Sequence, residues 1–177
     1  MESGDLKEEY FLFLVVIELK NGRIEAGGQV VIDDLSFVAP AGKVTCLTGV
    51  HGCGKTLLVR ALLGLWPLQR GYVSLKGEAV TLRSAQWLRR LMTYVPQQLP
   101  QPFTDALDVL DDQKSVPEKC CIIVDDPFCG MDDERAVLLT NRLQTLAESG
   151  KAVIVTCSPF DAVRFTPSVT LAYQISN

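Results

Sequence analysis

The chain has 177 residues, enough for one domain with a sizeable core, and 47% of them are hydrophobic, which excludes an intrinsically disordered protein. The formal net charge is -4 and no Lys/Arg cluster is present, so we expect no nucleic-acid partner. The acidic start, MESGDLKEE, argues against a secretory signal, and the apolar run from Phe11 to Ile17 is too short to span a bilayer. We therefore expect a cytoplasmic chain, folded as a single domain over residues 1–177, with no direct membrane insertion.

In chain order, hydrophobic patterning predicts strands over residues 10–19, 29–38, 43–48, 71–76, 92–95, 119–124, 152–156 and 169–175. Helices are expected over residues 57–65, 84–90 and 132–149, a turn over 21–29, and a loop over 100–117. Strands that alternate with helices and are continuously apolar indicate an α/β fold with a mostly parallel central sheet flanked by helices. The first strands add a small antiparallel β part on the N-terminal side.

The segment from Gly49 to Thr56 reads GVHGCGKT and fits the phosphate-binding loop pattern G-x-x-x-x-G-K-[ST]. Gly49, Gly52 and Gly54 let the backbone curl, so that several N–H groups point at one phosphate. The following helix directs its positive end at the same anion. Lys55 adds charge near the β- and γ-phosphates, and the Thr56 hydroxyl can bind Mg²⁺. A P-loop NTPase is therefore expected.

Two further side chains inside this loop, His51 and Cys53, could take part in the chemistry of the site. His51, the only histidine, could contact phosphate when charged, or it could be a neutral exposed residue whose backbone alone contributes. Cys53 lies beside a helix N-terminus, where a thiol becomes more reactive, so we hypothesise a reactive thiol that ATP protects. The six cysteines form no C-x-x-C pair, which argues against zinc, and Cys46, Cys120 and Cys121 are expected in the core.

A second motif, CCIIVDDP, ends an apolar strand on Asp125 and Asp126. We expect the strand to deliver both acids near the phosphate-binding loop, where Asp125 would hold Mg²⁺ directly or through water. The alternative is a pair of acids that cap a turn before Pro127.

From residue 29 onward the chain resembles the nucleotide-binding domain of ATP-binding-cassette (ABC) ATPases. The resemblance rests on segments in the family's order: VVIDDLSFVAPAGKVTCLTG, GYVSLKGEAV, LRRLMTYVPQQ, DDPFCGMD and AVIVTCSP. It implies that Gln97 is the Q-loop glutamine that contacts Mg²⁺ and the attacking water, that Asp125 is the Walker B aspartate, and that Asp132 is the D-loop aspartate. ATP and Mg²⁺ are the implied ligands. The residues expected at the nucleotide are Gly49, His51, Gly52, Cys53, Gly54, Lys55, Thr56 and Leu57, with Thr56, Gln97 and Asp125 at the metal and Asp126 and Gln97 in catalysis.

The chain also departs from the family. The family's helical subdomain and LSGGQ signature do not fit between Gln97 and Asp125, so the subdomain is expected to be absent between about residues 100 and 118. The string AGGQ, which ends at Gln29, precedes the phosphate-binding loop, and we interpret it as a turn. The aromatic residue expected to stack on adenine is missing near Ala26.

Three single positions differ as well. Asp126 stands where the family has its catalytic glutamate, and a shift of about 1 Å at a catalytic group can cost on the order of 100-fold in rate. Cys157 stands at the switch-histidine position, where a thiol is a poor substitute for imidazole. Leu57 replaces a hydroxyl that often contacts phosphate in the family.

Three functions remain open. The first is an ATP-binding protein with slow or partner-dependent hydrolysis, which could act as the ATP-binding subunit of a transporter. The second is a catalytically degenerate regulatory or structural module, and the third is a P-loop kinase of small molecules. The resemblance implies a signature-bearing ABC partner domain or separate membrane subunits, the latter placing the chain at the periphery of the inner membrane.

Overall fold

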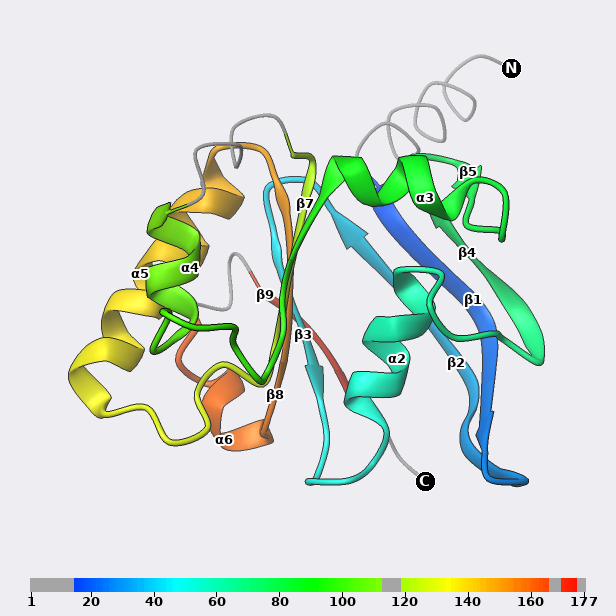
Figure 1. Ribbon diagram of the computed structural model, residues 1–177, viewed down its shortest axis with the longest axis horizontal. Helices are drawn as coiled ribbons and strands as arrows, with labels where there is room; N and C mark the ends of the chain where they lie inside the picture. The colour runs from blue at the N-terminus through cyan, green and yellow to red at the C-terminus, as the bar shows by residue number, and fades with distance from the viewer. Residues whose placement is uncertain (1–14, 113–118, 166–169, 175–177) are drawn as a thin grey trace, which may run out of the picture.

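Two β-sheets with helices between and beside them make up the computed structural model (Figure 1). The structure describes residues 15–112, 119–165 and 170–174. One sheet is parallel and the other antiparallel, which confirms the predicted fold class. Residues 10–14 of the first predicted strand lie outside the described residues.

The antiparallel sheet has the order β2 (Gln29–Pro40), β1 (Val15–Ala26), β4 (Arg70–Leu75) and β5 (Glu78–Ala79). The turn between β1 and β2 is only Gly27–Gly28, and both glycines have positive φ, as a two-residue hairpin requires. The AGGQ string is thus a turn, as predicted, but the turn predicted over residues 21–29 is wrong in extent. β1 continues through Asn21 and Gly22, where its register with β2 shifts and Asn21 has φ 49°. The Asn-Gly pair, a common hairpin signal, forms an irregularity within a long strand.

The parallel sheet has the order β6 (Met92–Val95), β7 (Cys121–Asp125), β8 (Ala152–Cys157), β3 (Val44–Thr48) and β9 (Thr170–Gln174). Strands β3, β7 and β8 are buried along their whole length, as expected for a sheet covered on both faces. Cys46 and Cys121 are fully buried in it, whereas Cys120 is half-buried. Residues that follow β3, β6 and β7 meet at one edge of the sheet, where ligands of open α/β sheets bind.

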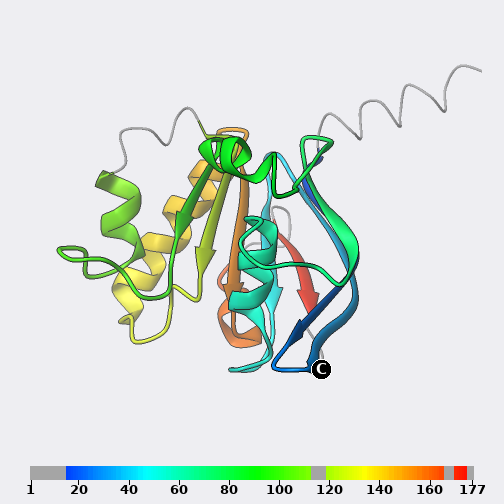
Figure 2. The ribbon, with the colours of Figure 1, turned by 45° about the vertical axis from the view of Figure 1, so that its right-hand side comes forward.

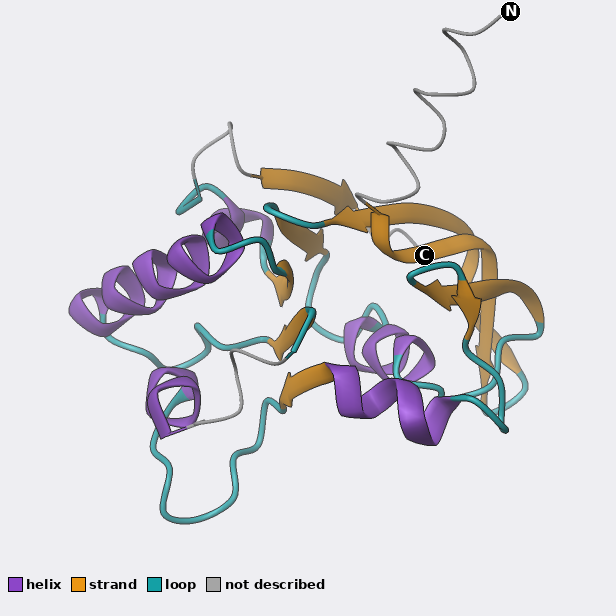
Figure 3. Ribbon diagram, turned by 90° about the horizontal axis from the view of Figure 1, so that it is seen from above, coloured by secondary structure: helices purple, strands orange, loops and turns teal. Residues whose placement is uncertain are grey.

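Helix α2 (Lys55–Leu62) lies between the two sheets, and α4 (Ala106–Asp112) and α5 (Asp133–Glu148) lie beyond the other face of the parallel sheet (Figures 1, 2 and 3). The remaining helices are short: α3 (Ala85–Leu88), η1 (Arg89–Leu91) and α6 (Pro159–Ala162). Alternate residues of these strands point to opposite faces of the sheet and pack into two separate hydrophobic cores. Ile123 and Ile154 belong to the core around α2, and Ile122 and Val155 to the core that contains Leu139 of α5.

Helix α4 corrects the loop predicted over residues 100–117. An Asp105 carboxylate oxygen accepts two main-chain N–H groups at the start of the helix, and Ala106, Val109 and Leu110 are buried at helical spacing. The surrounding prolines and aspartates are typical of loops, and they obscured the short helical spacing of the apolar residues. Residues 113–118 lie outside the described part of the chain.

Helix α5 begins and ends as its sequence predicts. The Asp132 side chain accepts the N–H of Arg135 as the N-cap, and Gly150 follows with φ 93°. Within the described residues, no helix combines the length and the apolar character that a membrane crossing requires.

Candidate functional site

The predicted phosphate-binding loop connects β3 to α2. Gly52 and Gly54 have φ 84° and 101°, which side chains of L residues rarely adopt. A Cβ atom on Gly54 would lie 2.5 Å from Val31 Cγ1, so β2 packs directly against the loop. Glycine is therefore required for the backbone curl at both positions, and at Gly54 also for space.

Lys55, the first residue of α2, is only 8% exposed. Its Nζ donates to the carbonyl oxygens of Gly49 at 2.8 Å and Val50 at 2.9 Å. Both acceptors are uncharged carbonyl oxygens, so these bonds hold the ammonium group at the loop without neutralising its charge. The charge remains available to an anionic ligand.

Asp125 ends β7 and is 1% exposed. Its Oδ1 accepts a hydrogen bond of 2.6 Å from the Thr156 hydroxyl on β8, the neighbouring strand. Its Oδ2 is buried and has no hydrogen-bond partner among the described residues. An unpaired buried carboxylate oxygen is costly, which is the usual mark of a missing cation or water.

Asp126 follows directly, in a left-handed conformation with φ 47°. Its Oδ2 accepts a hydrogen bond of 3.2 Å from Nε2 of Gln97, which brings the predicted Q-loop glutamine and the predicted catalytic acid together. Burial raises the pKa of the Asp126 carboxyl above its ordinary value, the charge of Lys55 opposes the rise, and the charge of Asp125 adds to it. A carboxylate with a raised pKa is a stronger general base than an exposed one.

A cavity of about 240 Å³ joins these groups. Its lining consists of His51, Gly52, Gly54, Lys55, Thr56, Leu57, Gln97, Asp125 and Asp126, all of them predicted site residues. Two other predicted residues do not line it. Gly49 is absent from the lining, and its N–H donates to the carbonyl of Cys157 at the end of β8, with an N···O distance of 3.4 Å. Cys53 is 2% exposed and packs in the core around α2, so its thiol is out of reach of an alkylating reagent and the predicted reactivity is not supported.

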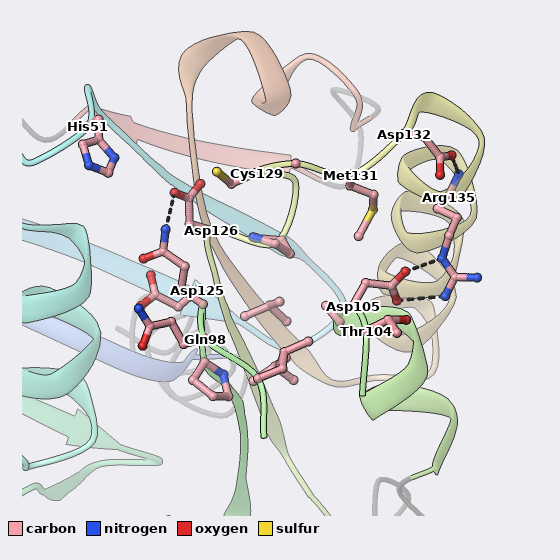
Figure 4. Close-up of a pocket in the computed structure, with 18 residues that line it drawn as sticks. His51, Gln98, Thr104, Asp105, Asp125, Asp126, Cys129, Met131, Asp132 and Arg135 are labelled. Atoms are coloured by element: carbon pink, nitrogen blue, oxygen red, sulfur yellow. Dashed lines mark hydrogen bonds and ion pairs between the residues drawn. The ribbon is translucent and has the colours of Figure 1, made fainter. Parts of the chain in front are cut away.

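His51 is exposed in the loop, in agreement with the simpler of its two interpretations. It also borders a second cavity of about 710 Å³, which shares Gln97, Asp125 and Asp126 with the first (Figure 4). On the far side of this cavity, Arg135 of α5 forms a fork with Asp105, and its Nη2 also donates to Asp108 at 2.8 Å.

Sequence reasoning missed this ion-pair cluster. Its members lie 27 and 30 residues apart in the chain, and only the unrecognised α4 brings them together. The amphipathic spacing of ALDVL in residues 106–110 was the one signal that could have indicated it.

The donor set at the small cavity fits Mg²⁺. Thr56 and Gln97 contribute neutral oxygens, and Asp125 contributes the unpaired carboxylate oxygen. Magnesium prefers such hard ligands and keeps several waters, so it is bound by one or two carboxylates together with substrate phosphates.

Cys157, at the position of the expected switch histidine, does not reach the small cavity. It is fully buried in the core on the α5 side of the sheet, whereas Thr156 is paired in register with Asp125. A hydrogen bond shared with Cys46, together with burial, holds the pKa of the Cys157 thiol far above its usual range. Cys157 is thus a core residue and does not contact the small cavity. At the place of the expected aromatic stacking partner the chain has Ala26, as its sequence shows.

A family model described as ABC transporter matches residues 32–154, well over half of the chain. The chain belongs to the ABC transporter family. Because the match spans the phosphate-binding loop and the strand that ends on Asp125, the ABC-type P-loop fold and the site lie within the shared region.

Two relatives illustrate the sequence similarity of this ABC family member. The Fe(3+) ions import ATP-binding protein FbpC 1 of Pectobacterium atrosepticum is 44% identical over 70 residues, which are 40% of this chain and 20% of that protein. The Nod factor export ATP-binding protein I of Sinorhizobium fredii is 27% identical over 190 residues, covering 80% of this chain and 55% of that protein. The chain therefore spans between a fifth and just over half of the length of these relatives.

Solved ABC structures share the fold. A nucleotide-free ATP-binding cassette from an ABC transporter superposes with a TM-score of 0.69 at 15% identity, covering 93% of this chain and 90% of that one. The cbiO1 subunit of the cbiONQ complex from Clostridium perfringens gives a TM-score of 0.66 at 13% identity, covering 82% and 78%. At these identities the likeness establishes the architecture alone.

Proposed function

We propose that this chain is an ATP-binding subunit that takes Mg-ATP in the 240 Å³ cavity. The observation that carries the proposal is the convergence of Lys55, Thr56, Asp125 and the hydrogen-bonded pair Gln97–Asp126 on that one cavity. A turn capped by two acids would not require an unpaired, buried Asp125 oxygen beside an unneutralised lysine.

Each group has a role in this proposal. The loop N–H groups and Lys55 bind the phosphate tail, with Leu57 and His51 at its border. Thr56, Asp125 and Gln97 would hold Mg²⁺, which neutralises charge on the β- and γ-phosphates when bound. Asp126 accepts a proton from the attacking water, and its hydrogen bond to Gln97 orients the carboxylate.

We infer that hydrolysis is slow or depends on a partner. Asp126 is one methylene shorter than glutamate, and Cys157 is turned into the core rather than toward the cavity. The second candidate function, a binding module without turnover, is favoured by the same orientation of Cys157, since the γ-phosphate then lacks that donor. A small-molecule kinase is the remaining alternative.

The partner proposal follows from the family. A signature-bearing ABC domain would complete the site across an interface, and membrane subunits would place the chain at the cytoplasmic side of the inner membrane. The relatives named above act in Fe(3+) import and Nod factor export, and these opposite directions give no transported substrate for this chain. We also retain the prediction of one domain over residues 1–177 that lacks the helical subdomain.

Isothermal titration of the purified chain with Mg-ATP and Mg-ADP tests binding. Lys55→Ala is expected to weaken affinity by at least about tenfold, the usual effect of losing a charge-assisted hydrogen bond. Absence of measurable affinity for any nucleoside triphosphate in the folded wild type would refute the proposal.

Turnover is tested separately. Steady-state phosphate release that disappears in Asp126→Asn supports the hydrolase, binding without release supports the degenerate module, and ATP consumption only with a hydroxyl-bearing acceptor supports the kinase.

A further inference from the structure

Thr156 contacts both aspartates of the site from outside the cavity lining: the side chain of Asp125 and the main-chain N–H of Asp126. It lies in β8, is fully buried, and is paired in register with Asp125 on β7. Its hydroxyl donates to Asp125 Oδ1 at 2.6 Å and accepts the main-chain N–H of Asp126 at 2.9 Å. The same N–H is 3.1 Å from the Thr156 carbonyl oxygen, so Thr156 supplies both of its acceptors.

We propose that Thr156 is a positioning residue that orients Asp125 for Mg²⁺ and fixes the turn that carries Asp126. This inference rests on the proposed function of the cavity. Thr156 itself does not line the cavity, so it acts only through the two aspartates.

The hydrogen-bonding capacity of the groups explains the orientation. A threonine hydroxyl has a single proton to donate, and here it is committed to Oδ1 of Asp125. Pinning one carboxylate oxygen fixes the plane of the group, and Oδ2 remains as the oxygen without a partner among the described residues. Oxygen ligands of metal ions are commonly held in this way by an outer hydrogen bond.

The Asp126 turn needs a similar restraint. With φ 47° this residue is in the left-handed region, which is sterically unfavourable for residues that carry a Cβ atom. Two acceptors on Thr156 hold its N–H in place, while its carboxylate meets Gln97. Loss of the hydroxyl would leave only the main-chain carbonyl to hold this turn.

Burial of a threonine in this sheet does not by itself imply such a role, and Thr45 provides the contrast. Thr45 lies in β3, is equally buried, and its Oγ1 has no hydrogen-bond partner among the described residues. The pair Thr156→Val and Thr45→Val therefore removes the same atom from the same sheet, with and without the two hydrogen bonds.

The test measures ATP affinity by calorimetry with Mg²⁺ and with EDTA in the wild type and in Thr156→Val, Thr156→Ser and Thr45→Val. We expect Thr156→Val to reduce the Mg²⁺-dependent gain in affinity by about tenfold or more, the typical loss when an outer hydrogen-bond partner is removed. The affinity measured in EDTA should stay within about twofold of the wild type, because the loop and Lys55 are untouched. Thr156→Ser should restore the gain, and Thr45→Val should match the wild type.

The outcomes separate the two proposals. If the wild type binds no nucleotide, the proposed function fails. If it binds and Thr156→Val keeps the full Mg²⁺ gain, or Thr156→Ser loses as much as Thr156→Val, the role of Thr156 is overturned. Should Thr156→Val not fold, Thr156→Cys, with its much weaker hydrogen-bonding group, replaces it. Failure of both to fold while Thr156→Ser folds would make Thr156 a folding residue and would also overturn the proposal.

Discussion

Replacing Gly54 by alanine should destabilise the protein through two separable effects. The first is conformational, because φ 101° is unfavourable for any residue with a Cβ atom, at about 1–2 kcal/mol. The second is steric, because the new Cβ would lie 2.5 Å from Val31 Cγ1, and forced overpacking costs about 1–3 kcal/mol. Valine is β-branched and stiff, so it cannot rotate away easily. The expected loss for Gly54→Ala is thus about 2–5 kcal/mol in the free energy of unfolding.

Gly52→Ala is the matched control, since Gly52 has φ 84° but a Cβ there meets nothing within 4 Å. It should cost only the conformational part, about 1–2 kcal/mol. Urea unfolding followed by circular dichroism measures the free energy of unfolding of both variants. In a double-mutant cycle, the loss caused by Gly54→Ala should be smaller by about 1 kcal/mol or more when Val31 is also replaced by alanine, because the steric part is relieved. Equal losses for the two glycines, or no recovery with Val31→Ala, would show that β2 does not press on the loop.

Three further predictions concern the other face of the parallel sheet. Leu139→Ala removes a fully buried side chain from α5 and should lower the free energy of unfolding by about 2–5 kcal/mol. Val137→Ala, at a position 53% exposed on the same helix, should change it by less than about 0.5 kcal/mol. Similar losses for the two variants would contradict the assigned core. The hydrogen bond from Arg135 lowers the pKa of the Asp105 carboxyl, although burial opposes the effect, so this pair contributes stability above the ordinary aspartate pKa of about 3.9 that is lost as the pH falls below it. Urea midpoints measured between about pH 6 and pH 3 should therefore fall less in Arg135→Gln than in the wild type, and parallel curves would refute the assignment. Cys157→Ala should leave Mg-ATP affinity within about twofold of the wild type, because its side chain faces α5, and a larger change in calorimetry would place it at the nucleotide.

The core of the site could be predicted from the sequence because its information is local. The eight-residue loop pattern specifies the curled backbone, the lysine and the hydroxyl group of the phosphate site. The apolar strand that ends on Asp125 specifies the edge of the sheet at which this acid lies. The structure accordingly brings nine of the predicted residues to one cavity. The alternation of helices with continuously apolar strands also indicated the parallel sheet.

What the sequence did not reveal depends on pairing between distant segments. The role of Thr156 follows from the register of β8 against β7, 31 residues away, and the fork of Arg135 onto Asp105 depends on how α4 docks against α5. Tertiary context also overrode a local signal at Asn21, where β1 pairs with both β2 and β4 and continues through an apparent turn. Helix α4 was missed because the sequence around it carries turn-forming prolines and aspartates, and the contacts that stabilise the helix come from distant residues of α5.

The alternation of β8 makes the departure at Cys157 difficult to reverse. Neighbouring side chains on this strand point to opposite faces, and position 157 belongs to the dry layer shared with Cys46. A histidine introduced there would place a titratable ring among apolar side chains, where neither its charge nor its volume could be accommodated without repacking. A histidine substituted at position 157 would therefore not deliver an imidazole to the cavity, and such a group would have to come from another segment or from a second protein.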